Sequence, residues 1–162
     1  MKIGIVADTH SQDIPKALIE ALKDVDLIIH AGDFCSRKEY EQFARLKPIK
    51  AVYGNMDDDD IRKKLPRREI ITLEDCVIGL VHGDGSPKTI LDCVQEEFKK
   101  DKVNVIIFGH SHTPVNQMID GILYFNPGSP NDAIYAPYFS YGVLEVNKGK
   151  LSGQIVKLKG QK

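Results

Sequence analysis

The sequence is poor in cysteine, with three among its 162 residues, at positions 35, 76 and 93. Their spacing matches neither a zinc ribbon nor a Cys-x-x-Cys pair, and their number is odd. We therefore expect free thiols, which argues against a disulfide-stabilised scaffold and against a thiolate metal site.

Long hydrophobic runs are also missing. No apolar stretch approaches the roughly 20 residues that a membrane helix needs. The apolar run at residues 3–7 is too short for the core of a signal peptide, and Asp8 follows it at once. These absences predict a cytoplasmic protein without a membrane partner.

The sequence has no excess of charge of one sign, since 22 basic and 23 acidic residues leave a formal net charge of -1. A dedicated nucleic-acid binder normally carries a strongly basic face, so we expect no stable nucleic-acid binding. The length predicts a single domain over residues 1–162, which buries roughly 70% of the surface of its unfolded chain.

The first third of the chain alternates between strand and helix patterns. Short apolar runs at residues 3–7, 27–29 and 49–53 are typical of buried strands. Between them, residues 14–24 have helical spacing, and Ser36 is placed to cap a helix that reaches about Leu46. This order predicts a parallel sheet that is covered on both faces.

The rest of the chain is richer in strands. We predict strands at residues 69–73, 77–81, 103–108, 115–119, 122–125, 141–146 and 151–157, and a helix at about residues 88–99. Asp120-Gly121 and Lys148-Gly149 have hairpin-turn chemistry, so this part is expected to be mostly antiparallel. The whole pattern predicts an α/β fold of two packed sheets with helices outside.

Four of the five histidines directly follow predicted strands, in short polar segments rich in glycine and aspartate. Ligand sites of open parallel sheets lie at the carboxyl ends of the strands, where these groups collect. The segments are Asp8-Thr9-His10, Gly32-Asp33, Gly54-Asn55-Met56-Asp57, His82-Gly83-Asp84 and Gly109-His110-Ser111-His112.

The spacing and chemistry of these segments suit a metal ion. Residues two apart in an extended segment point to the same side, so Asp8 can converge with His10, and His110 with His112. The neighbouring glycines let the backbone turn sharply. Carboxylates, imidazoles and an amide without a thiolate suit manganese, iron, zinc or nickel. To explain each residue separately, as a turn or strand-end group, would require seven coincidences.

The ordered series of segments between residues 8 and 112 resembles the calcineurin-like metallophosphoesterases. The later segment Asn126-Pro127-Gly128-Ser129 is similar to the short, single-domain phosphodiesterase branch of that family. The resemblance implies a four-layer α-β-β-α sandwich, in which two mixed β-sheets are flanked by helices. It also implies the hydrolysis of a small phosphodiester substrate.

The resemblance further implies two divalent metal ions (manganese, nickel, iron or zinc), which share a water and lower its pKa enough to form hydroxide near neutral pH. Catalysis would depend on Asp33, Asn55 and His82 through the metals and this bridging hydroxide, with the Asp33 carboxylate itself bridging the ions. One ion would be held by Asp8, His10, Asp33 and His112, and the other by Asp33, Asn55, His82 and His110.

One position departs from the family pattern. Many members of the family that this chain resembles carry a histidine at the position of Met56, and that imidazole is thought to protonate the leaving group or to stabilise the transition state. Met56 has no proton to donate, which implies a bias toward diesters or esters with good leaving groups. Asp57 is expected to orient a ligand histidine from behind.

Other polar residues near these segments have structural interpretations. We predict that His30 lies in the core or supports the site, and that Cys35 is a buried thiol, although its position would also let it approach the site. Residues 58–60 are expected to start a solvated helix before Ile61. Asn126 is interpreted either as orienting a ligand or the bound phosphate, or as purely structural.

Alternative functions remain open at this stage. Residues 32–40 resemble a segment of a retromer scaffold subunit, so a non-catalytic protein-interaction scaffold is the main alternative, and a regulatory nucleotide sensor is a minor one. That scaffold departs from the metal pattern at several positions, whereas all seven donors are present here. The aromatic residues at 135, 138, 139 and 141 fit either a contact surface in a homo-oligomer or the core. Loops 58–68, 83–88 and 129–138 are the expected rim of the cleft.

Overall fold

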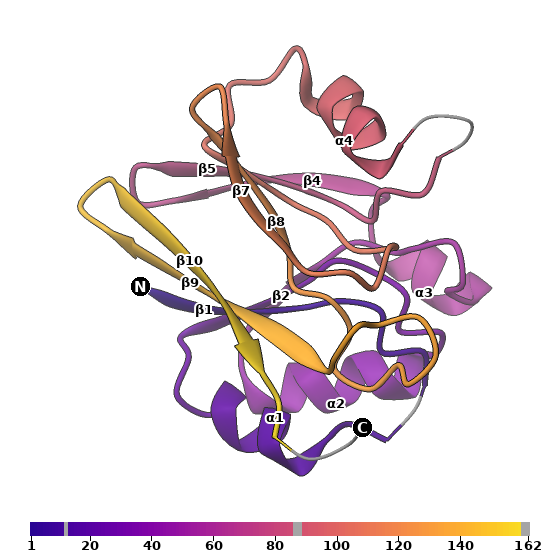
Figure 1. The fold of residues 1–162 in the computed structure, drawn as a ribbon. Coiled ribbons are helices and arrows are strands. Elements are labelled where there is room, and N and C mark those ends of the chain that lie inside the picture. Colours follow the sequence, from indigo (N-terminus) through magenta and orange to yellow (C-terminus); the bar gives the residue numbers. More distant parts are fainter. Residues whose placement is uncertain (12, 86–88, 160–162) are drawn as a thin grey trace.

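The computed structural model describes residues 1–11, 13–85 and 89–159. The first third of the chain alternates strand and helix as its apolar pattern predicts (Figure 1). Its elements are β1 (Lys2–Val6), α1 (Lys16–Leu22), β2 (Leu27–His30), α2 (Arg37–Leu46) and β3 (Ile49–Ala51).

The remainder of the chain contains two short helices and seven strands among the described residues. In order they are α3 (Asp59–Lys64), β4 (Arg68–Leu73), β5 (Cys76–Val81), α4 (Ile90–Phe98), β6 (Val105–Ile107), β7 (Val115–Ile119), β8 (Ile122–Asn126), β9 (Ser140–Asn147) and β10 (Lys150–Lys157).

Two mixed sheets of five strands pack against each other, with strand orders β10-β9-β1-β2-β3 and β4-β5-β6-β8-β7. Apolar side chains from both, such as Ile29 and Ile78, fill the space between them. The outer face of the first sheet packs against α1, α2 and α3 around Phe43, and the outer face of the second packs against α4 around Phe98 (Figure 1). The predicted four-layer α-β-β-α sandwich is confirmed.

Most strand pairs of the second half are antiparallel, as expected, but two are parallel. β6 pairs in parallel with both β5 and β8, because α4 connects β5 to β6 as a crossover. β9 and β10 leave the second sheet and complete the first one beside β1. The two predicted hairpin turns are correct, and Asp120, Gly121, Lys148 and Gly149 all have the positive φ angles that such turns need.

The helix starts agree with the predictions to within a few residues. Asp58 caps α3 by accepting a hydrogen bond from the Ile61 N–H at 2.9 Å, as expected of a solvated helix start. Ser36 occupies the N-cap of α2, but its hydroxyl accepts a hydrogen bond from Ser11 instead of capping the helix.

Residues 86–88 lie outside the described residues. They include Lys88, the predicted first residue of the next helix, and part of the predicted rim of the cleft. No described helix combines the length and the apolar character that a bilayer-spanning segment requires.

Candidate metal centre

The seven predicted ligands lie in loops at the carboxyl ends of five strands, which pair in parallel within each of the two sheets. In the first sheet, the loops after β1, β2 and β3 carry predicted ligands. In the second sheet, the loops after β5 and β6 carry them. Because the sheets pack face to face, these strand ends meet at one seam. The residues are Asp8, His10, Asp33, Asn55, His82, His110 and His112.

Two groups of donors form within this seam. Asp8, His10 and His112 make one, and Asp33, His82 and His110 make the other. Within each group the potential ligand atoms lie within 4.8 Å of one another. In the first group, the Nε2 atoms of His10 and His112 face each other at 3.0 Å. Each group therefore has the composition and closeness of a site for one cation.

Asp33 lies between the two groups, and Asn55 lies beside the second. Asp33 Oδ2 lies 3.1 Å from His82 Nε2 in its own group and 3.9 Å from His10 Nε2 in the other. Asn55 Oδ1 lies 3.2 Å from His82 Nε2. The Asp33 carboxylate therefore lies between the two groups, and the Asn55 amide lies beside the second group.

The backbone reaches this arrangement in a way that the sequence argument did not foresee. Asp8 and His10 converge in one donor group, but His110 and His112 belong to different groups, and the segments are not extended. These four residues and Asp33 all have left-handed conformations, with φ between 51° and 67°. Non-glycine residues rarely adopt such angles, and they cluster at functional sites where surrounding contacts hold them.

Two glycines provide space for the carboxylates. A Cβ atom on Gly54 would lie 2.1 Å from Asp33 Oδ1, and one on Gly109 would lie 2.9 Å from Asp8 Oδ2. Neither residue has a positive φ. At these two positions the requirement for glycine is therefore the close approach of a carboxylate. The sharp turns that the sequence argument expected occur at Gly32 and Gly83, whose φ angles are 95° and 98°.

The electrostatics of the site favour a bound cation. Asp8 is fully buried, and its Oδ2 atom has no hydrogen-bond partner among the described residues. Burial raises the pKa of Asp8 to about 6, since its charged form is poorly solvated there. A buried carboxylate oxygen without a partner is costly, and a divalent cation beside it would remove that cost. The donor set thus fits the metal ions that the resemblance implies.

His82 is the most constrained of the imidazoles. Its Nδ1 lies 2.7 Å from the Ala31 carbonyl oxygen, a contact that places the proton on Nδ1 and leaves Nε2 free to bind a metal. Burial disfavours its charged form, but the hydrogen bond to Asp33 and the charge of Asp8 raise its pKa to about 9. Metal binding at Nε2 would therefore displace a proton.

The carboxylate of Asp57 supports the site differently from the prediction. Its oxygens accept hydrogen bonds from the backbone N–H groups of Gly54 (2.7 Å), Asp33 (2.9 Å) and Cys35 (2.7 Å). The expectation that it orients a histidine is therefore wrong. Asp57 instead fixes the backbone of the loops that carry Asp33 and Asn55.

The loop between β8 and β9 contains support residues that sequence reasoning missed. Asp132 Oδ2 makes a short contact with His112 Nδ1, so that Nε2 of this histidine points into the first donor group. Asn131 Nδ2 donates to the Thr9 carbonyl oxygen at 2.9 Å, and Ser129 Oγ donates to that of Asp8 at 2.8 Å. The polar composition of residues 129–132 indicated a loop, but not which distant segment it would contact.

Asn126 supports the loop that carries two of the predicted ligands, and the interpretation that it orients a ligand or the bound phosphate stays a prediction. It is fully buried, and its Nδ2 donates to the Gly109 carbonyl oxygen at 2.8 Å and to Ser111 Oγ at 3.1 Å. These contacts hold the loop of His110 and His112 in place.

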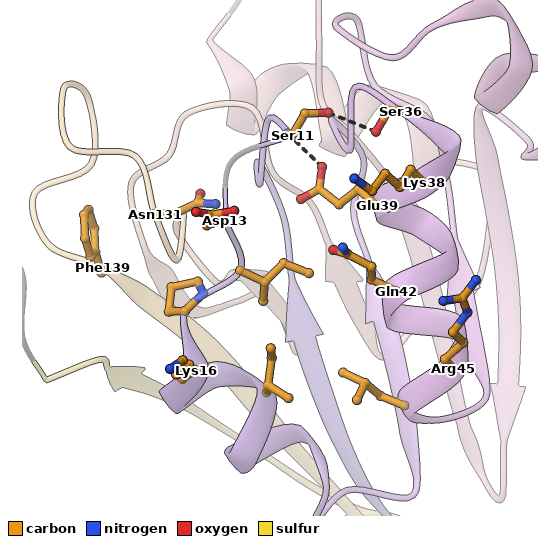
Figure 2. Close-up of a pocket in the computed structure, with 14 residues that line it drawn as sticks. Ser11, Asp13, Lys16, Ser36, Lys38, Glu39, Gln42, Arg45, Asn131 and Phe139 are labelled. Carbon is orange, nitrogen blue, oxygen red and sulfur yellow. Dashed lines mark hydrogen bonds between the residues drawn. The ribbon is translucent and has the colours of Figure 1, made fainter.

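Glu39 of α2 supports the loop after β1 from the other side. Its carboxylate accepts a hydrogen bond from the Ser11 N–H at 2.7 Å, as Figure 2 shows. Burial raises the pKa of Glu39 to about 7. A pocket of about 970 Å³ beside it is lined by α1, α2 and the β8–β9 loop (Figure 2). The sequence pattern placed this glutamate on a helix without indicating its burial.

His30 and Cys35 behave differently from each other. His30 is fully buried and stacks on Phe34 with a centroid distance of 3.6 Å, as its predicted core role requires. Cys35 is partly buried, and its Sγ lies 3.5 Å from His10 Nδ1. Burial and the charge of Asp33 raise the pKa of this thiol to about 12. Cys35 therefore approaches the site as a neutral thiol, as one of its two interpretations allowed.

The comparisons with known proteins point to one family. Residues 1–149 match the calcineurin-like phosphoesterase superfamily domain. The chain is 33% identical over 162 residues to a probable metallophosphoesterase of Methanothermobacter thermautotrophicus, with 97% of this chain and 92% of the relative covered. It is also 33% identical over 144 residues to a phosphodiesterase of Methanocaldococcus jannaschii, with 79% of this chain and 83% of the relative covered.

A solved structure shares the fold. Vps29 of Entamoeba histolytica, in a single-mutant form, has a TM-score of 0.79 at 22% sequence identity, covering 98% of this chain and 100% of the other.

Proposed function

Because the chain belongs to the calcineurin-like phosphoesterase superfamily, we propose that it is a phosphodiesterase that uses two divalent metal ions. The observation that carries the proposal is the pair of donor groups at the seam of the two sheets, with Asp33 between them. A relative named as a phosphodiesterase supports the choice of reaction.

The proposed ligand sets follow the two groups. Asp8, His10 and His112 would hold one ion, together with Asp33. His82 and His110 would hold the other, together with Asn55 and the same Asp33 carboxylate. Manganese, nickel, iron and zinc all accept such mixed oxygen and nitrogen ligands.

The site needs no protein nucleophile for hydrolysis. Two divalent cations, when bound, would supply an activated water and offset the charge of the phosphate group. The protein holds the donors in fixed directions: Ala31 O sets the ring of His82, and Asp132 sets that of His112. Met56 lies in the pocket beside Asp33 and has no proton for a leaving group. We therefore infer a preference for diesters and for esters with good leaving groups.

The test combines elemental analysis with hydrolysis of bis(4-nitrophenyl) phosphate in the presence of each of the four metals. We expect about two bound ions per chain and metal-dependent turnover. The variant Asp33→Asn should lower turnover by about 100-fold or more, because loss of a carboxylate between two ions exceeds the 10- to 100-fold cost of losing a mere supporting contact.

Asp120→Asn is the matched control, because it makes the same change at an exposed turn between β7 and β8. Its turnover should equal that of the wild type. Unchanged turnover in Asp33→Asn protein with its full metal content would contradict the proposed function.

A protein-interaction scaffold is the second candidate, and the shared fold with Vps29 is the observation that keeps it open. A scaffold would not need donors for two cations, all of which this chain retains. Bound metal without hydrolysis of any diester, across the four metals, would favour the scaffold over the enzyme.

A further inference from the structure

Three large apolar side chains remain exposed around the candidate metal centre. Met56, Ile134 and Tyr135 are 57%, 80% and 75% exposed, and we call them the apolar rim. All three line a pocket of about 560 Å³ that also contains donors of both groups, among them His10 and His110. Apolar side chains gathered at the mouth of a polar site are typical of ligand recognition.

The apolar rim is held in a fixed relation to the metal donors. Asp132 Oδ1 accepts hydrogen bonds from the backbone N–H groups of Ile134 (2.7 Å) and Tyr135 (3.2 Å), while its Oδ2 contacts His112. The ring of Tyr135 stands edge-on to that of His112, with a centroid distance of 6.0 Å. One carboxylate therefore positions both a proposed metal ligand and the rim beside it.

The charge of the pocket restricts what it would accept. Its described lining contains histidines, acidic residues, polar side chains and the apolar rim, but no lysine or arginine. A second phosphate group would find no cation of the protein there, and it would face Asp132. The part of a ligand that extends beyond the metal centre is thus expected to be uncharged and apolar.

We propose that the apolar rim binds an aromatic group of the phosphate ester, so that the site selects aryl esters over esters of small aliphatic alcohols. The proposal rests on the proposed function, because the phosphoryl group must sit on the two donor groups. The flat face of Tyr135 and the flexible thioether of Met56 both suit contact with an aromatic ring.

The test measures binding and does not require turnover. Phenylphosphonate and methylphosphonate share the metal-binding head and differ in one aromatic ring. Calorimetric titration of the metal-loaded protein should show about tenfold tighter binding of phenylphosphonate. In Tyr135→Ala and in Ile134→Ser, this preference should fall to about twofold or less, while the affinity for methylphosphonate stays the same.

Met118→Ala is the matched control, since Met118 is 60% exposed on β7 and does not line the pocket. It should keep the full preference. Equal wild-type affinities for the two phosphonates, a preference that survives both rim variants, or no binding of either phosphonate would each overturn the proposal.

The failure of the proposed function can be told apart from the failure of this inference. A tenfold preference for phenylphosphonate without hydrolysis of any diester would support aromatic binding at the apolar rim and contradict the proposed phosphodiesterase activity. Hydrolysis of diesters without a preference for phenylphosphonate would overturn only the proposal that the apolar rim binds an aromatic group. If sedimentation shows a dimer that Tyr135→Ala dissociates while the preference is unchanged, the rim binds a second copy and the proposal is overturned.

Discussion

Single buried carboxylates determine how the donors of the metal centre are presented. Asp57 accepts three backbone N–H groups from two loops, and Asp132 joins His112 to the loop that carries Tyr135. Each of these side chains acts through a neighbour, so their effect on function is one of orientation. Under the proposed function, the rate of the chemical step would depend in addition on which proton donors reach the substrate, and Met56 has no proton to donate.

Replacement of Met56 by histidine tests this point. We expect Met56→His to raise kcat for phenyl phosphate by about tenfold or more, because an imidazole can protonate a poor leaving group. The backbone N–H of residue 56 donates to Asp33 Oδ1 at 2.8 Å, and the substitution retains that contact. Met56→Gln, similar in size but without a useful proton, is the control. Equal rates in the two variants, at equal metal content, would show that residue 56 does not limit monoester cleavage.

At the level of whole elements, the two sheets are held together by close packing at strand glycines. Phe125 of β8 is fully buried, and its ring lies against β9 and β10 of the opposite sheet. A Cβ atom on Gly142 would lie 2.3 Å from Phe125 Cε1, and one on Gly153 would lie 2.8 Å from Phe125 Cε2. The absence of side chains at these glycines therefore sets how closely the sheets approach, and with it the seam where the donors meet.

The variant Gly142→Ala should lower the free energy of unfolding by about 1–3 kcal/mol. The gain in strand propensity from alanine, roughly 0.5–1 kcal/mol, is smaller than the cost of overpacking at this distance. Urea unfolding would measure the change, with the exposed Ser152→Ala on β10 as a control that should stay within about 0.5 kcal/mol of the wild type. A Gly142→Ala variant as stable as this control would mean that the Phe125 ring moves aside freely.

Across the whole molecule, each donor group takes residues from both sheets. Asp8 and His10 follow β1 of the first sheet, whereas His112 follows β6 of the second; Asp33 follows β2, whereas His82 follows β5. A cation in either group would therefore connect the two halves of the sandwich. Binding to the folded state alone stabilises it by mass action.

Removal of metal should consequently lower the melting temperature. At free metal about 1,000-fold above Kd the stabilisation is about 4 kcal/mol. For a chain of this length such a change corresponds to roughly 10 °C in Tm. Calorimetry before and after treatment with a chelator would measure the shift, and added metal should reverse it. His112→Ala should show a smaller shift than the wild type. Identical Tm values for loaded and chelated wild-type protein would contradict binding across the two sheets.

Much of the fold and the identity of the donor segments could be predicted because their signals are local. Apolar runs such as residues 3–7 and 27–29 specify buried strands wherever they occur, and the polar segments that end them follow directly in the chain. The helix start at Asp58 and the turn at Asp120-Gly121 depend on a few adjacent residues. The amino-acid sequence by itself therefore determined the order of elements and which side chains stand at the strand ends.

The tertiary structure alone decided what those side chains contact. Three of these contacts join segments that are distant in the chain. β6 pairs with β8, Asp132 supports His112, and the buried Glu39 accepts a hydrogen bond from Ser11. The left-handed conformations of Asp8 and His110 likewise exist only because surrounding contacts hold them. Such features depend on how two sheets pack, and no local pattern carries that information.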